Sequence, residues 1–146
     1  MIYVSHDHFY KGWMGLEVCT NNYSELVAVW TVLLWAQQIL LREICIFGDS
    51  RIVIDWLLGN TVLKAVHLKH WCNRIRLLLN TFHSHSISQT YRENNIAVDI
   101  LSKRGIGGPT GILWVDEYLS KEIRRNYKHI LFLICYILFT IIFWFC

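Results

Sequence analysis

Hydrophobic and polar residues follow two periods along the chain, one typical of strands and one typical of helices. Short β-prone runs occupy Glu43–Phe47 and Ser84–Tyr91. Longer stretches that contain neither glycine nor proline predict helices over Ser24–Leu41, Arg51–Leu58, His67–Asn80 and Asn95–Lys103. Strands that alternate with helices in this way predict the α/β class, in which helices cover a sheet.

The first 23 residues give a weaker pattern. Ile2–Val4 and Leu16–Cys19 predict short strands on either side of a turn at Lys11–Gly15, which contains two glycines. Three polar residues, Thr20, Asn21 and Asn22, then offer side-chain oxygens that suit the start of a helix. The long helix that follows is apolar on almost every side, so we expect it to be buried between a sheet and other helices.

Glycines mark the end of this regular pattern. Gly105–Gly111 holds four glycines and the only proline of the chain, which predicts a domain boundary. We therefore expect a globular domain at 1–105, a linker and basic segment at 106–128, and an apolar segment at 129–146.

The apolar segment is a candidate transmembrane helix. Ile130–Cys146 has 17 residues and no charge. A helix of that length reaches about 26 Å, slightly less than the roughly 30 Å hydrocarbon core of a bilayer. Four basic residues precede it: Lys121, Arg124, Arg125 and Lys128. Basic residues beside a transmembrane helix favour the cytosolic side, so they would place the preceding domain in the cytosol. A buried core helix is one alternative. Translation of T-rich non-coding DNA is another. The segment lacks Gly, Ala and Val, whose codons all begin with G, and most of its residues can be encoded by T-rich triplets.

Composition excludes several classes of protein. The 146 residues include 7 Trp, 7 Tyr and 7 Phe and carry a net charge of only +3, which argues against intrinsic disorder and says little about a nucleic-acid partner. Five cysteines without a CxxC pair favour a reducing compartment, cytosolic or nuclear, over a disulfide framework. His67, His70 and Cys72 lack the second ligand pair of a zinc site.

Three carboxylates occupy informative positions. Glu25 lies near the start of the long helix, Asp49 directly follows the Glu43–Phe47 strand, and Asp99 lies in the helix after the last strand. Each has a purely structural explanation, since acids favour helix starts and solvated helix faces. Together they also suit two-metal phosphodiester chemistry, in which several carboxylates converge on a pair of Mg²⁺ ions.

Three ordered motifs resemble the ribonuclease H type 1 domain, and most closely the plant reverse-transcriptase-like subgroup derived from non-LTR retroelements. They are TNNYSEL (Thr20–Leu26), IFGDS (Ile46–Ser50) and YRENNIAVDILSKRG (Tyr91–Gly105). The resemblance implies a mixed sheet flanked by helices and an RNA–DNA hybrid as partner. It implies that Glu25, Asp49 and Asp99 are catalytic residues that bind Mg²⁺, with Mn²⁺ as a substitute. Nucleic-acid contacts would come from Thr20, Asn21, Asn22 and Ser50.

The sequence departs from that family in two places. Family members carry a first catalytic aspartate in an opening strand, whereas the only aspartate before Glu25 is Asp7, outside any predicted strand. We therefore expect an N-terminally truncated domain without that strand. Gln89 stands where the family has His, and an amide cannot exchange a proton near neutral pH. The resemblance implies metal-dependent hydrolysis of RNA in hybrids, weakened or lost here. A non-catalytic nucleic-acid-binding module and a membrane-tethered interaction protein are the alternatives.

Overall fold

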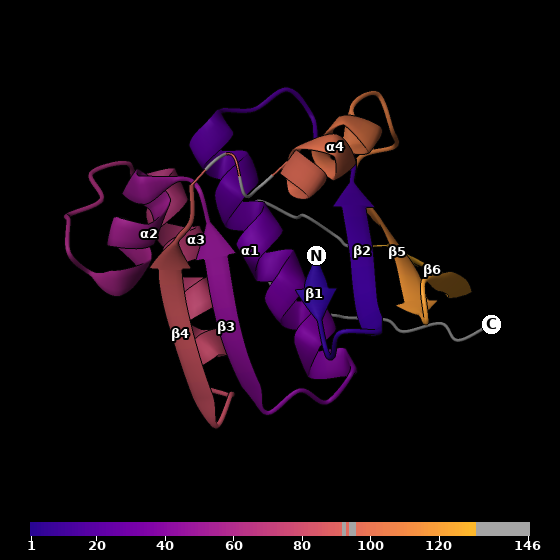
Figure 1. Ribbon diagram of the computed structural model, residues 1–146. Coiled ribbons are helices and arrows are strands. Elements are labelled where there is room, and N and C mark those ends of the chain that lie inside the picture. The colour runs from indigo at the N-terminus through magenta and orange to yellow at the C-terminus, as the bar shows by residue number, and fades with distance from the viewer. Residues whose placement is uncertain (92, 94–95, 131–146) are drawn as a thin grey trace. The chain divides into compact units, whose positions relative to one another are not determined.

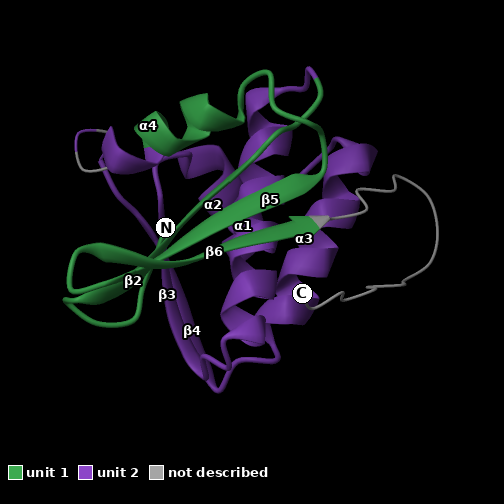
Figure 2. Cartoon of the chain, turned by 90° about the vertical axis from the view of Figure 1, so that its right-hand side faces the viewer, with its two compact units in different colours: residues 1–17, 99–146 green, residues 18–98 purple. Residues whose placement is uncertain are grey.

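The computed structural model describes residues 1–91, 93 and 96–130 and divides the chain into two compact units. Unit 1 comprises Met1–Glu17 and Asp99–Cys146, and unit 2 comprises Val18–Val98 (Figure 2). The α/β class expected from the sequence is confirmed, because each described unit contains β-structure and helical residues.

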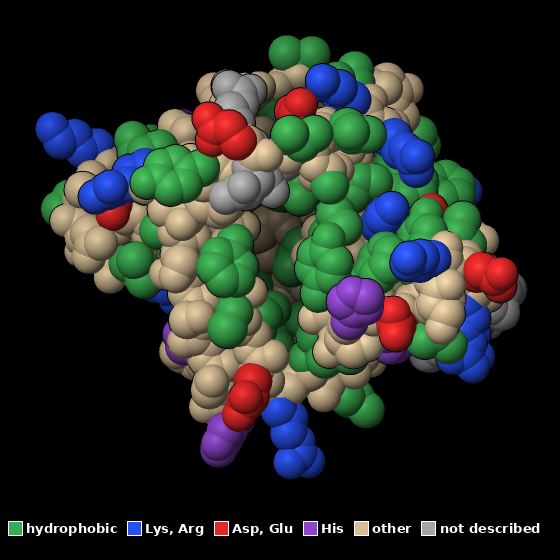
Figure 3. All heavy atoms as spheres, viewed as in Figure 1, with side chains coloured by type: hydrophobic (Ala, Val, Ile, Leu, Met, Phe, Trp, Pro, Cys, Tyr) green, Lys and Arg blue, Asp and Glu red, His purple; other side chains and the backbone are tan. Residues whose placement is uncertain are grey.

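Unit 2 holds a parallel pair of strands with helices on one face. β3 (Glu43–Gly48) pairs in parallel with β4 (Ser84–Gln89). α1 (Asn21–Gln38), α2 (Arg51–Leu58) and α3 (Val66–Leu79) lie behind this pair in Figure 1 and to one side of it in Figure 2. The other face carries exposed side chains, among them Phe47, and Figure 3 shows hydrophobic side chains open to solvent over these strands.

The core of unit 2 lies where α1 meets α3. Leu26, Val27 and Leu33 of α1 and Ile75 of α3 are fully buried. The hydroxyl of Thr31, also buried in α1, donates to the carbonyl oxygen of Val27 at 2.8 Å, which satisfies a polar group that burial would otherwise penalise. The expectation that α1 is buried on several sides is confirmed.

Unit 1 is built on an antiparallel sheet in the order β1-β2-β5-β6. Its strands are β1 (Ile2–Tyr3), β2 (His8–Met14), β5 (Ile112–Leu119) and β6 (Glu122–Ile130). α4 (Ile96–Gly105) crosses from unit 2 into unit 1 at Asp99. Side chains alternate along β2 and β5, and Tyr10, Leu113 and Val115 are buried on one face of the sheet.

The expected N-terminal pattern is wrong in detail. Lys11–Gly15, expected as a turn, forms the second half of β2 as far as Met14, and no strand forms at Leu16–Cys19. β2 pairs along its whole length with β5, from His8 opposite Leu119 to Met14 opposite Leu113. That partner lies about a hundred residues away, so local sequence patterns could not reveal the pairing.

The expected linker at 106–128 is also wrong, because β5 and most of β6 lie within it. Glycines here permit close backbone contact: a Cβ on Gly15 would lie 2.6 Å from the carbonyl oxygen of Gly108. Ser120 and Lys121 join β5 to β6 with φ angles of 52° and 70°, as a type I′ hairpin turn requires at both central positions. The segment after Gly105 is therefore part of the unit 1 sheet.

The expected apolar helix at 129–146 is not supported. His129 and Ile130 belong to β6, and the remaining positions, 131–146, lie outside the described residues. Within the part of the chain that the structure describes, no helix is both long and apolar enough to cross a membrane.

Candidate metal and nucleic-acid site

Two of the three candidate carboxylates belong to unit 2. Glu25 is the fifth residue of α1, one turn later than expected, because the helix begins at Asn21. Asp49 directly follows β3, and Ser50 is the N-cap of α2. β3 and β4 are parallel, so their carboxyl ends meet at one edge, where Gln89 is the register partner of Gly48.

Electrostatics couple Glu25 to Asp49. Glu25 is half-buried, and its pKa is raised, first by burial and second by the negative charge of Asp49. Among residues 1–91, 93 and 96–130, neither carboxylate forms an ion pair or a side-chain hydrogen bond. Mg²⁺ prefers oxygen ligands, and two neighbouring carboxylates supply such oxygens. These residues therefore fit a divalent cation, although two carboxylates supply only part of its coordination.

Asp99 belongs to unit 1. It lies in the first turn of α4, is exposed, and forms an ion pair with Lys103 at 3.2 Å. This geometry fits a solvated helix residue. The described residues contain no group of three or more His, Cys, Asp and Glu side chains positioned to hold a metal. That finding includes His67, His70 and Cys72.

The polar residues at the start of α1 cap the helix and also expose polar side chains to solvent. The Thr20 side chain accepts a hydrogen bond from the backbone N–H of Tyr23 at 3.4 Å, so the expected helix cap is present. Asn21 is exposed and Asn22 half-buried. The Ser50 side chain makes no capping hydrogen bond to α2, which leaves its hydroxyl available.

Asn22 lines a groove that the sequence did not reveal. The groove has a volume of about 470 Å³, and its other lining residues come from α2, the α2–α3 loop and α3. Trp56 and Ile52 make it mainly apolar, while Lys64 adds a positive charge. Lys64 is the only cation between Arg51 and Lys69, a weak signal that identified no site by itself.

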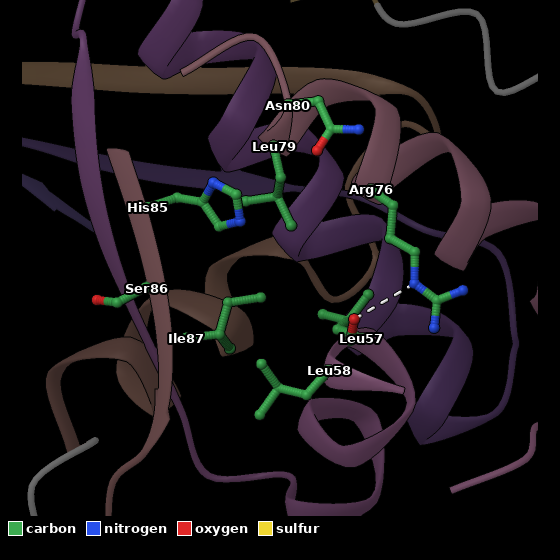
Figure 4. A pocket seen from close by; sticks show the side chains of 8 residues that line it. All are labelled: Leu57, Leu58, Arg76, Leu79, Asn80, His85, Ser86 and Ile87. Carbon is green, nitrogen blue, oxygen red and sulfur yellow. Dashed lines mark hydrogen bonds between the residues drawn. The ribbon is translucent and has the colours of Figure 1, made fainter. Parts of the chain in front are cut away.

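A second pocket of about 180 Å³ lies elsewhere in unit 2 and contains none of the candidate residues. Arg76 is one of its lining residues, and the Arg76 side chain donates to the backbone carbonyl of Leu57 at the end of α2 (Figure 4). It also donates to the backbone carbonyl of Trp56. Carbonyls at a helix C-terminus lack partners within the helix, so this arginine has a structural role.

The family's remaining positions carry little additional chemistry here. Gln89 is exposed, and Arg92 and Asn94 of the turn before α4 lie outside the described residues. Asp7 lies in the turn between β1 and β2, is exposed, and contacts His6 at 2.9 Å. It belongs to unit 1 and lies outside the strands.

Comparison with known proteins places this fold. A family model described as reverse transcriptase-like matches residues 6–105. RNase H1 from the halophilic archaeon Halobacterium salinarum is similar in structure, with 30% sequence identity and a TM-score of 0.59 over 60% of this chain and 67% of that chain. The N-terminal RNase H domain of a Mycobacterium tuberculosis protein, solved as a fusion with maltose-binding protein, shares the fold at 22% identity, with a TM-score of 0.58 over 60% and 63% of the two chains.

The chain thus spans about two thirds of each solved structure. No match was found among curated proteins. The matched family model covers more than half of the chain, and its limits enclose all three candidate carboxylates. The chain therefore belongs to the reverse transcriptase-like family and contains a ribonuclease H-type domain.

Proposed function

We propose that this protein binds nucleic acid and hydrolyses the RNA strand of RNA–DNA hybrids with the help of Mg²⁺ or Mn²⁺. The proposal rests on the match of residues 6–105 to the reverse transcriptase-like family model and on the pair Glu25 and Asp49 in unit 2, where burial and then the charge of Asp49 raise the pKa of Glu25. A pair of carboxylates in this state gains stability from a divalent cation, which removes their mutual repulsion.

The residues of the chain would divide the work as follows. Glu25 and Asp49 of unit 2 would hold the cation. Asn21, Asn22 and the Ser50 hydroxyl hold the substrate backbone, because amides and hydroxyls are common ligands of phosphate and sugar. When bound, a divalent cation held by these two carboxylates would supply an activated water and stabilise the leaving oxygen. Lys64 adds a positive charge to the groove beside Asn22.

We further propose that hydrolysis is weak. The described residues before α1 offer no aspartate in a strand, and Asp7 is exposed in a turn. Gln89, at the same sheet edge as Asp49, keeps hydrogen-bonding capacity but cannot transfer a proton near neutral pH. A site with fewer carboxylates binds its cation less tightly and aligns the attacking water less well.

The first test is cleavage of a hybrid with labelled RNA in Mg²⁺ or Mn²⁺. We expect the unaltered chain to cleave little above background, and Asp49→Asn to abolish the residual cleavage because it removes a cation ligand. Asp55→Asn is the matched control, since Asp55 pairs with the exposed Arg51 and takes no part in the proposed site. Adding an opening strand with its aspartate should raise cleavage by the otherwise unaltered chain, but not by the Asp49→Asn variant.

Two outcomes would contradict this account. Residual cleavage that survives Asp49→Asn would remove Asp49 from the site. Strong cleavage by the unaltered chain that is lost in Asp7→Asn would show that Asp7 supplies the first carboxylate.

A non-catalytic binding role is the second candidate, and Gln89 is the observation that favours it. A non-catalytic role predicts that the chain binds a hybrid equally well in EDTA and in Mg²⁺, and that it cleaves the hybrid in neither Mg²⁺ nor Mn²⁺. Binding that requires the metal would favour hydrolysis instead.

A further inference from the structure

One face of the unit 1 sheet combines aromatic rings with cations. It is formed by Phe9, Lys11 and Trp13 of β2, Trp114 and Tyr118 of β5, and Lys128 of β6. Strand alternation and register place these six on the same side, with Phe9 opposite Tyr118 and with Trp13, Trp114 and Lys128 in one row across the sheet. We call it the aromatic-basic face. Its residues from β5 and β6 lie outside the segment matched by the family model, which ends at residue 105.

The rings of this face are arranged in two rows. Phe9 and Tyr118 stack with their centroids 4.9 Å apart and their planes 8° from parallel. Trp13 and Trp114 form the other row, four residues and roughly 13 Å away along the strands. All four rings are half-buried, and Tyr3, which pairs with Phe9, is 67% exposed. Each row therefore presents aromatic surface to solvent.

Each row also has a cation beside a ring. The Lys11 Nζ lies 4.5 Å from the ring centroid of Tyr118, and the Lys128 Nζ lies 4.8 Å from that of Trp114. Arg104 adds a guanidinium 5.3 Å from Trp13. Asp116 is the acid in the row between them, but it is buried and accepts a hydrogen bond from Asn126. Exposed charge on the face is therefore positive.

We propose that the aromatic-basic face binds single-stranded nucleic acid. Unpaired bases stack on aromatic rings, and cations beside those rings neutralise the phosphates. When a base stacks on a ring, the lysine beside that ring must move away. Its flexible stem lets the ammonium leave the ring and contact a phosphate instead. A duplex keeps its bases stacked on one another, so the face favours a single strand. This role does not depend on the carboxylates and goes beyond the proposed hydrolysis.

The test is fluorescence anisotropy of labelled dT20 with the full chain, in EDTA and low salt so that no metal site contributes. We expect Tyr118→Leu, which removes a stacking ring, to weaken binding roughly fivefold to a hundredfold. Tyr118→Phe keeps the ring and should bind like the unaltered chain. Because the assay is run in EDTA and scores binding instead of cleavage, a failure here is distinct from a failure of hydrolysis.

Charge is tested separately with an exposed lysine, because its loss should leave the fold intact. Lys128→Ala should reduce the slope of log Kd against log salt by about 0.7, the value for one phosphate contact on a single strand. Lys69→Ala removes an equally exposed lysine from α3 and should leave the slope unchanged. Circular dichroism checks that each variant folds.

Several results would overturn the proposal. They are failure of the unaltered chain to bind dT20, equal affinity of Tyr118→Leu and Tyr118→Phe, an equal change of slope in Lys69→Ala and Lys128→Ala, or a loss of duplex binding in Tyr118→Leu as large as its loss of dT20 binding.

Discussion

Glu25 carries a charge that its surroundings oppose. Burial and the neighbouring Asp49 both raise its pKa, so the folded chain holds a proton on Glu25 more readily than the unfolded chain does. Ionised Glu25 therefore lowers the free energy of unfolding. Such a cost at one residue is common at functional sites, where a ligand relieves it.

This cost predicts a stabilising substitution. Glu25→Gln should raise Tm at pH 7.5 by a few degrees, since about 1 kcal/mol corresponds to roughly 3–5 °C in a domain of this size. The gain should shrink toward zero below pH 4.5, where Glu25 is protonated in both states. Thermal unfolding at several pH values measures it, with the exposed Glu43→Gln as a control that changes nothing. A pH-independent gain would attribute the effect to packing instead of charge.

The local contacts of the candidate site residues were partly predictable from the sequence. Thr20 caps α1 as expected because capping depends on neighbours three residues away. Lys103 pairs with Asp99 through a helical i,i+4 contact, which sequence spacing also allows. The groove beside Asn22 could not be predicted, because it gathers residues from α1, α2, α3 and the loop before α3.

At the scale of elements, β2, β5 and β6 share a buried carboxylate. Glu117 accepts hydrogen bonds from Tyr10 at 3.1 Å and Tyr127 at 3.0 Å, and its carboxylate lies 2.9 Å from the Nε2 of His8. Burial opposes its ionisation, but these hydrogen bonds outweigh burial and lower the pKa of Glu117. Burial and the Glu117 contact raise the pKa of Tyr10 to about 12. The ionised carboxylate thus ties the strands together.

Removing that charge should weaken the sheet. Glu117→Gln should lower the free energy of unfolding at pH 7 by about 2 kcal/mol, the typical worth of hydrogen bonds to a charged group. A lowered pKa gives stability that is present above the unfolded pKa of about 4.5 and is lost as pH falls below it. Urea titrations at pH 7 and pH 3.5 should therefore show a smaller difference at pH 3.5. The exposed Glu122→Gln is the control, and a larger loss at pH 3.5 would contradict the network.

The elements that sequence patterns predicted best are those with local signals. α2 matches its predicted bounds, because a strand, a Gly-Asp-Ser turn and a glycine with φ of 80° at the C-cap delimit it locally. β5 and β6 were missed because their β-prone residues lie between a glycine-rich segment and an apolar run. Those neighbours suggested a linker and a membrane helix, whereas β5 depends on pairing with distant β2, and β6 pairs with β5.

At the scale of the whole molecule, each of the two units contains a sheet of its own. The parallel pair β3-β4 and the antiparallel set β1-β2-β5-β6 are separate sheets among the described residues. The resemblance predicted a mixed sheet flanked by helices that lacks the family's opening strand. The family match over residues 6–105 includes β2 of unit 1 and both strands of unit 2.

The central claim is that Glu25 and Asp49 form a divalent-cation site, and binding of Mn²⁺ tests it most directly. Electron paramagnetic resonance counts free Mn²⁺ in a titration of the full chain and detects weak binding. We expect the unaltered chain and Asp55→Asn to bind one ion with equal affinity, and Asp49→Asn and Glu25→Gln to bind it at least tenfold more weakly. No binding by the unaltered chain, or equal binding by Asp49→Asn, would contradict the account.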